Sequence, residues 1–292
     1  MGGMFGESKY DVLRKVPPQY TPVTTFVKPP FEKFEAIKKM YDAGLQFPVI
    51  FKPDLGERGF MVHRINDERD VENYLSKMKY PFVIQELIDL PLEFGVFYLR
   101  FPNQSRGRVT SVVVKEMLSV TGDGRSTLQQ LIFQKDRAIL QWETLKQIYS
   151  NDLNEVIPVG ITKKLVSIGN HCLGTKFLDG SHLINDKLSA TFDEISKQID
   201  GFYFGRFDLR CATLEDLYNG KVKVLELNGC GAEPAHIYDP SYSLLRAIAV
   251  LLNHWKNIFL IARENERLGT AYIPLKEARI HYKKFKEATQ LS

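Results

Sequence analysis

Two short polar patterns near the end of the sequence hold residue types suited to phosphate and metal chemistry. Arg206 and Asp208 are separated by one residue, and Glu226 and Asn228 repeat that spacing further along the chain. Since successive side chains of a strand point to opposite faces, each pair lies on one face of its strand. If the two strands pair, three oxygen donors of the kind Mg²⁺ prefers converge with a guanidinium. A polar sheet face exposed to water is the alternative, but both segments are otherwise apolar, which favours a functional cluster.

A lysine followed by a glycine-containing loop is a second candidate, for anion binding. Lys52 ends an apolar segment predicted as a strand, and Gly56 and Gly59 follow in the loop. Glycines let backbone N–H groups approach phosphate oxygens, and lysine supplies a positive charge. The pattern is not a Walker A loop, because no Gly-Lys-Ser/Thr occurs and no helix is predicted directly after it. An ordinary hairpin with an exposed lysine is the alternative interpretation.

A third candidate lies where a predicted strand leaves a small module and enters a larger one. Glu86 ends this strand, and Ile88 and Glu93 follow it. Such a hinge offers backbone groups for an adenine edge and carboxylates for ribose hydroxyls. Two solvent-facing glutamates beside a Pro-Leu turn are an equally plausible interpretation.

Three further features extend these candidates. Lys115 follows an apolar strand and could place a second ammonium near phosphate, and the glycine loop 121–127 precedes a predicted helix whose N–H groups could bind an anion. The loop 229–234 directly follows the proposed metal ligands, where a substrate carboxylate could bind. Cys230 in this loop has no evident histidine-based activation motif, so we interpret it as a small, partly buried thiol.

The elements that must position these residues give an α+β chain. Periodicity predicts strands at 47–52, 59–65, 82–86, 92–100, 108–120, 202–211 and 221–227, and helices at 31–44, 67–78, 127–149, 192–199 and from 241 onward. Asn219-Gly220 is a hairpin turn signal between the last two strands. A small β-rich module at about 47–86 therefore precedes a larger one.

Composition limits the class of protein. The 292 residues carry a net charge of +4, too mild to indicate a nucleic-acid partner, and 44% are hydrophobic, as in a globular protein with a sizeable core. Three scattered cysteines exclude a disulfide framework and favour a reducing cytoplasm. The most apolar stretch, 244–261, contains Arg246, His254 and Lys256, so no transmembrane segment is predicted.

The order of these motifs resembles the ATP-grasp superfamily. The resemblance covers about residues 8–240. Its motifs are, in order, a strand ending in Lys52-Pro53 with its glycine loop, a hinge glutamate, a second glutamate, Arg-x-Asp and Glu-x-Asn. Within the superfamily the pattern is similar to D-alanine–D-alanine ligases, whereas the loop 121–127 is similar to that of cyanophycin synthetases. The resemblance implies two α+β subdomains that clasp ATP: residues 1–46 pack on the core, 47–88 form a small lid, and 89–292 form a large subdomain with C-terminal helices.

The resemblance also implies roles for individual residues, with ATP and Mg²⁺ as cofactors. Phosphate contacts would come from Lys9, Lys52 and Lys115, with Gly56 and Gly59 in the loop over the phosphates. Adenine and ribose contacts would come from Glu86, Ile88 and Glu93. Magnesium ligands would be Asp208, Glu226 and Asn228, and Arg206 would stabilise the oxyanion. The implied reaction joins a small-molecule carboxylate and an amine through an acyl phosphate.

The chain departs from the D-alanine–D-alanine ligase pattern in two places. Lys9 already matches the start of the central domain, so we expect a missing N-terminal domain, a longer precursor that could be membrane-proximal, or a homodimer that completes the site. The loop 229–234 lacks the usual Thr-Ser-Pro-Gly, which leaves the amino-acid substrate open. A kinase-like phosphotransferase and a non-catalytic nucleotide-binding module are the alternative functions.

Overall fold

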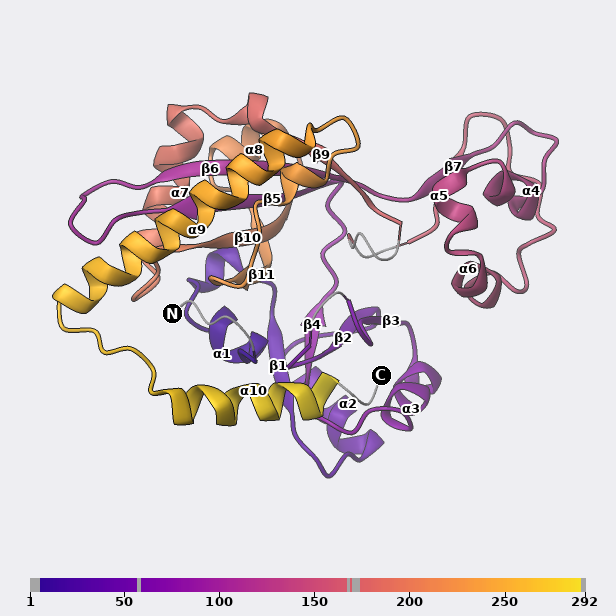
Figure 1. Ribbon diagram of the computed structural model, residues 1–292. Coiled ribbons are helices and arrows are strands. Elements are labelled where there is room, and N and C mark those ends of the chain that lie inside the picture. The colour runs from indigo at the N-terminus through magenta and orange to yellow at the C-terminus, as the bar shows by residue number, and fades with distance from the viewer. Residues whose placement is uncertain (1–5, 57–58, 167–168, 170–173, 290–292) are drawn as a thin grey trace. The chain divides into compact units, whose positions relative to one another are not determined.

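The computed structural model describes residues 6–56, 59–166, 169 and 174–289. It divides into two compact units, one formed by residues 1–114 and 178–292 and the other by residues 115–177 (Figure 1). The predicted division at 46 and 88 differs from this, because residues 115–177 form a unit of their own.

The small sheet of the first unit has four antiparallel strands in the order β1-β4-β2-β3. Its elements are β1 (Thr24–Val27), α2 (Lys33–Asp42), β2 (Val49–Pro53), β3 (His63–Ile65), α3 (Glu68–Leu75) and β4 (Phe82–Glu86). Phe51, Phe82 and Tyr74 pack edge to face or tilted in its core, together with Met40 from α2. The predicted strand 59–65 is shortened to β3. The strand β1 joins the sheet by pairing with β4.

Two short elements precede this sheet, α1 (Lys9–Leu13) and the 3-10 helix η1 (Pro18–Tyr20). The Ser8 hydroxyl accepts a hydrogen bond from the Asp11 N–H and so caps α1. Pro17 and Pro18 follow α1 closely and mark its end.

The large sheet of the first unit contains the polar patterns of the sequence. Its strands run in the order β11-β10-β5-β6-β9. The elements are β5 (Leu92–Leu99), β6 (Arg108–Glu116), β9 (Lys176–Asp179), η3 (Ser181–Leu183), α7 (Asp186–Lys197), β10 (Phe204–Cys211), α8 (Leu214–Tyr218), β11 (Lys223–Asn228) and η4 (Ala235–Tyr238). Alternation divides β10 cleanly: Phe207 and Leu209 join the core beneath α7, whereas Arg206 and Asp208 lie on the opposite face.

The connection between β10 and β11 corrects one expectation. Asn219-Gly220 does not make a two-residue hairpin turn, because α8 lies between the two strands. Asn219 is instead the C-cap of α8, and Gly220 follows with φ of 71°. A glycine with positive φ can end a helix and can also form a tight hairpin turn, so the Asn-Gly sequence is compatible with both structures.

The second unit has its own small core. It comprises β7 (Ser119–Thr121), α4 (Leu128–Phe133), α5 (Asp136–Ile139), α6 (Trp142–Ile148) and β8 (Thr162–Lys164), and β7 pairs with β8. Thr127 and Gln130 form a capping box at the start of α4. The single helix predicted for 127–149 is therefore three short helices that surround Leu128, Ile132 and Leu145.

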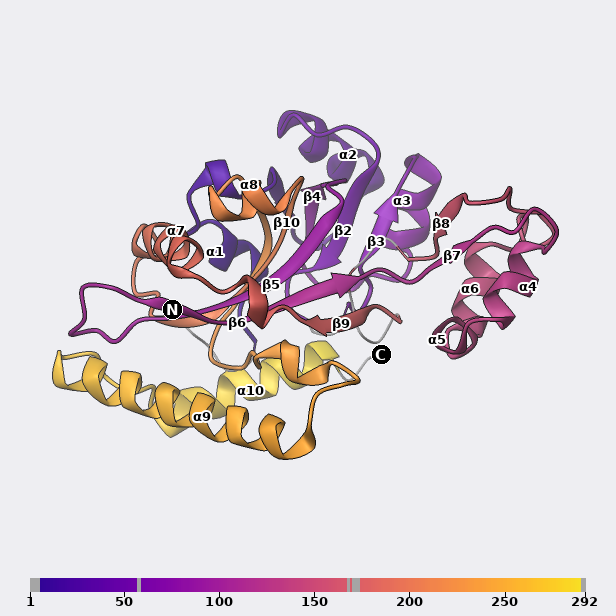
Figure 2. The same ribbon diagram turned by 90° about the horizontal axis from the view of Figure 1, so that it is seen from above.

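Two helices end the chain, α9 (Leu244–Arg267) and α10 (Leu275–Thr289). The sequence predicts one helix, but it breaks at Gly269, whose φ is 95°, before Pro274. In Figure 2, α9 and α7 lie on opposite sides of strands β5 and β10. By length and composition alone, α9 is the one helix of the described residues that could cross a membrane.

Candidate functional site

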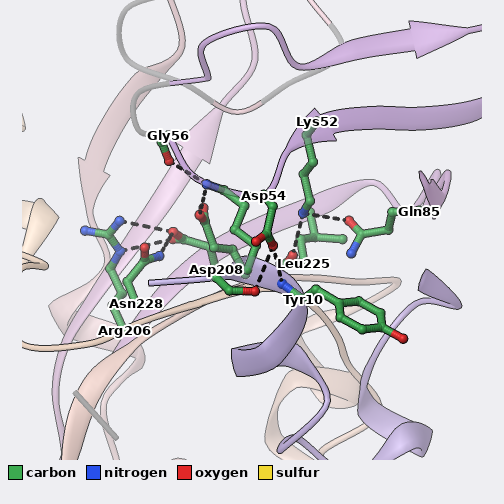
Figure 3. Close-up of polar contacts among 12 residues, drawn as sticks. Tyr10, Lys52, Asp54, Gly56, Gln85, Arg206, Asp208, Leu225 and Asn228 are labelled. Carbon is green, nitrogen blue, oxygen red and sulfur yellow. Dashed lines mark hydrogen bonds and ion pairs between the residues drawn. The ribbon is translucent and has the colours of Figure 1, made fainter. Parts of the chain in front are cut away.

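The two polar patterns meet on the face of strands β10 and β11 that is opposite to α7. Arg206 pairs in register with Asn228, and Asp208 with Glu226. Arg206 donates to both Asp208 oxygens, at 3.1 Å from Nε and 3.0 Å from Nη2, and Asn228 Nδ2 donates to Asp208 Oδ2 at 2.9 Å (Figure 3). The structure therefore brings together all four residues that the sequence pattern placed on one face.

Gly95 makes room for this cluster from the neighbouring strand β5. It lies opposite Asp208, and a Cβ added there would stand 2.6 Å from Val113 Cγ1, 3.1 Å from Asp208 Oδ1 and 3.2 Å from Arg206 Cδ. Gly95 was not among the residues predicted from the sequence. The available signal was a glycine in the interior of an apolar strand, which often marks a close approach of other groups.

Glu226 is the more accessible carboxylate of the cluster, since 36% of its side chain is exposed, against 9% for Asp208. Its Oε1 lies 3.8 Å from Lys9 Nζ. Lys9 also donates a hydrogen bond to the Gly56 carbonyl. Its ammonium group therefore connects α1 and the glycine loop to Glu226 on strand β11. Lys9, Gly56 and Glu226 belong to separate motifs of the sequence, and the structure brings them together.

Lys52 is the buried cation of the site. It comes from β2 in the small sheet, is 6% exposed, and donates to Gln85 Oε1 and to the Leu225 carbonyl, both at 3.0 Å (Figure 3). The register between β10 and β11 shifts next to Leu225, which leaves that residue outside the regular pairing. Burial lowers the pKa of Lys52 to about 8, although the nearby Glu226 carboxylate opposes the shift.

Asp54 is a second residue that the sequence analysis did not select. It is 5% exposed, and its Oδ1 accepts hydrogen bonds from Ser8 Oγ at 2.9 Å and from the Tyr10 N–H at 3.0 Å (Figure 3). Burial raises the pKa of Asp54, and these two hydrogen bonds oppose that shift. Asp54 thereby holds the start of α1, which carries Lys9, against the end of β2. Its position two residues after Lys52 was the only sequence signal.

The hinge residues behave differently from one another. Glu86 Oε2 accepts from the Val23 N–H at 3.0 Å. Glu93 is only 5% exposed, and its carboxylate accepts from Arg210 Nε at 2.8 Å. Arg210 Nη1 also donates to the Ile88 carbonyl at 2.6 Å. In this structure the Glu93 carboxylate forms a buried ion pair, because Arg210 lies opposite it on β10.

The two predicted loop glycines, Lys115 and Cys230 are the remaining residues predicted from the sequence. Gly56 and Gly59 have φ of 143° and 74°, which suits glycine, and the loop residues 57–58 between them lie outside the described residues. Lys115 belongs to the second unit, where its Nζ lies 5.8 Å from the Phe177 ring centroid. Burial raises the pKa of the Cys230 thiol, which agrees with an unreactive cysteine.

The donor set can be compared with the needs of Mg²⁺. Within the described part of the chain, no group of three or more His, Cys, Asp and Glu side chains is arranged to hold a metal. Asp208, Glu226 and Asn228 nevertheless supply two carboxylates and an amide from paired strands, and hard oxygen donors suit Mg²⁺. Three hydrogen bonds already reach the Asp208 carboxylate, so Glu226 offers the more open oxygens.

Comparisons with known proteins find similarity at the level of structure. No family model matches the chain, and no curated protein matches it. It is similar to a bifunctional glutathione synthetase from Pasteurella multocida (16% identity, TM-score 0.40, 85% of this chain and 35% of that one). It is also similar to a D-Ala:D-Ser ligase from Enterococcus faecalis (13% identity, TM-score 0.47, 86% of this chain and 62% of that one). A D-alanine–D-alanine ligase from Bacillus anthracis is similar as well (13% identity, TM-score 0.47, 91% of this chain and 69% of that one). The chain thus spans between about a third and two thirds of these proteins.

Proposed function

We propose that the protein is an ATP-dependent carboxylate–amine ligase of the ATP-grasp type. The observation that carries the proposal is the convergence of groups from separate motifs: Lys52 of the small sheet contacts β11, and Lys9 lies beside Glu226. Cations and hard oxygen donors so arranged suit a triphosphate with its metal. The order of the motifs along the chain adds independent support.

The proposed reaction has two steps. The γ-phosphoryl group passes to a substrate carboxylate, giving ADP and an acyl phosphate. An amine then attacks the acyl carbon, and inorganic phosphate leaves as the amide forms. Lys9 and Lys52 would bind phosphate oxygens, and Arg206 would stabilise the oxyanion of the second step. No side-chain nucleophile is needed.

The nucleotide and metal contacts are assigned within the same proposal. Glu86 and Ile88 at the end of β4 would meet the adenosine. Glu93 is left out because Arg210 holds its carboxylate. Asp208, Glu226 and Asn228 would hold Mg²⁺, which when bound neutralises phosphate charge.

ADP release tests the proposal. The protein is incubated with ATP, Mg²⁺ and a panel of amino acids and other carboxylates, each with and without an amine. We expect ADP release that depends on both, and Asp208→Asn should abolish it while the circular dichroism spectrum persists. Asp42→Asn, an equal charge change on exposed α2, is the matched control and should leave the rate unchanged. Phosphorylated product without amine dependence would instead establish a kinase-like enzyme.

One observation favours a second candidate, a non-catalytic nucleotide-binding module. Asp208 is 6% exposed and already accepts hydrogen bonds from Arg206 and Asn228, as a purely structural carboxylate would. This candidate predicts ATP binding by calorimetry without ADP release for any substrate pair. It also predicts that Glu226→Gln changes binding little, whereas the ligase proposal predicts a loss of metal-dependent binding.

A further inference from the structure

Helix α9 uses only one of its faces to pack on the protein. His254, Asn257 and Ile261 are buried on this inner face. The His254 ring lies 5.0 Å from the Phe97 ring and 4.9 Å from the Phe204 ring, measured between centroids, and its Nε2 lies 3.0 Å from the Ala232 carbonyl. Because a carbonyl can only accept, Nε2 carries the proton. This inner face holds α9 along the large sheet.

The opposite face of α9 is apolar and exposed. Leu245, Leu252 and Phe259 are 78%, 68% and 58% exposed, and Ile248 and Trp255 are each 46% exposed. Spacings that alternate between three and four residues place these five on one stripe of the helix. Exposed apolar side chains scattered singly are ordinary, but a continuous stripe along a helix marks a binding surface. We call these five residues the outer stripe.

The charges along α9 are mainly basic, and its only acidic residues, Glu264 and Glu266, lie in its last turn. Residues 240–263 contain Arg246, Lys256 and Arg263 and no Asp or Glu. The Arg263 guanidinium lies 5.7 Å from the Phe259 ring centroid at the border of the stripe, and its Nε lies 3.6 Å from Glu266 Oε2. Residues 241–292 contain nine Lys and Arg and four Asp and Glu, a net charge of +5. Because the whole chain has a net charge of +4, residues 1–240 have a net charge of −1. The positive charge of the protein is therefore concentrated in its C-terminal helices.

We propose that the outer stripe of α9 binds the surface of an anionic lipid bilayer. The helix would lie in the plane of the interface, with Leu252, Trp255 and Phe259 among the acyl chains and the bordering Arg and Lys beside lipid phosphates. A transmembrane orientation does not fit, because the inner face packs on the sheet through His254 and Ile261. The outer stripe does not include the residues of the proposed ATP site, so membrane binding can be tested independently of the proposed enzyme activity.

A second copy of the chain fits this surface less well. Helices that pair through such a stripe commonly match acidic with basic residues at its borders. Two copies of α9 would instead face each other with Arg246, Lys256 and Arg263, and the only acidic residues of the helix are Glu264 and Glu266 in its last turn. An anionic lipid surface supplies the opposite charge on a flat support, which suits a straight stripe.

Vesicle binding tests the proposal with Trp255 as the reporter. The full chain carrying Trp142→Phe, which leaves Trp255 as its only tryptophan, is mixed with phosphatidylcholine vesicles with and without phosphatidylglycerol. We expect about tenfold or more tighter binding to the anionic vesicles, weakened by salt. Trp255 emission should shift to shorter wavelength and be quenched by brominated acyl chains.

Matched variants separate the stripe from general surface properties. Leu252→Glu with Phe259→Glu should abolish vesicle binding, whereas Phe34→Glu with Leu140→Glu makes the same charge change at side chains 76% and 81% exposed and should leave it intact. Equal binding by both double variants, or no blue shift on anionic vesicles, would overturn the proposal. A dimer that forms without lipid, buries Trp255 and is lost only in the Leu252→Glu/Phe259→Glu variant would also overturn the proposal, because the stripe would then bind a second copy of the chain.

Discussion

Lys52 provides a quantitative test of the proposed site, because its charge titrates near neutral pH. Burial lowers its pKa from 10.5 to about 8. The protonated fraction of Lys52 then falls from about 0.9 at pH 7 to about 0.1 at pH 9. If a nucleotide phosphate pairs only with the ammonium, its affinity should fall about tenfold over this range, or about 1.4 kcal/mol. The charged groups that surround Lys52 are Glu226, Lys9, Asp208 and Asp54.

Calorimetric titration with ATP and excess Mg²⁺ measures this effect. Repeating the titration at pH 8 in buffers of different ionisation enthalpy counts the protons taken up on binding, which should be about one half per nucleotide. Lys52→Met should bind more weakly and take up none of these protons. Lys38→Met, which removes a lysine paired with Asp42 on the surface, should behave like the unaltered protein.

The same pKa shift has a consequence for the ligand-free protein. Since the folded-state pKa of Lys52 lies below the unfolded value, the folded protein binds fewer protons between pH 8 and pH 10.5. The free energy of unfolding should therefore rise with pH across that window, by up to about 3 kcal/mol, and the rise should be absent in Lys52→Met. An affinity for ATP that is constant from pH 7 to pH 9, with no proton uptake, would refute this assignment of Lys52.

Further predictions concern the support of the site. Gly95→Ala should lower the free energy of unfolding by about 1–3 kcal/mol in urea, because the added methyl overlaps its neighbours; an unchanged midpoint would contradict the close approach. Glu93→Gln leaves the Arg210 guanidinium buried without its carboxylate and should cost about 3–5 kcal/mol, and a loss below 1 kcal/mol would show that the pair is solvated. Burial lowers the pKa of His254, so the stability of the protein should fall as pH drops below 6.5, and less steeply in His254→Phe. The same variant leaves the Ala232 carbonyl without its donor, at a cost of about 1–3 kcal/mol at pH 8.

Local sequence patterns determined the parts of this protein that depend on a single element. The one-residue spacings in Arg206–Asp208 and Glu226–Asn228 predicted that each pair shares a strand face, because side chains of a strand alternate whatever surrounds it. The apolar residues around them predicted that the polar pairs form a functional cluster and not a water-exposed sheet face. The α+β class and several element positions followed from periodicity in the same way.

Only the tertiary structure decided which groups face one another across the chain. Arg210 neutralises Glu93 because their strands pair in that register, and no spacing near Glu93 distinguishes this from an open carboxylate. The contact of Lys52 with the Leu225 carbonyl likewise depends on a register shift in a strand far along the sequence. Helix α9 shows the same limit: its apolar residues occur around the whole helix, and only packing of the His254 face on the sheet decides that the outer stripe remains exposed. Periodicity is set by the backbone of one segment, whereas register and packing are set by the fit between segments, which local sequence does not contain.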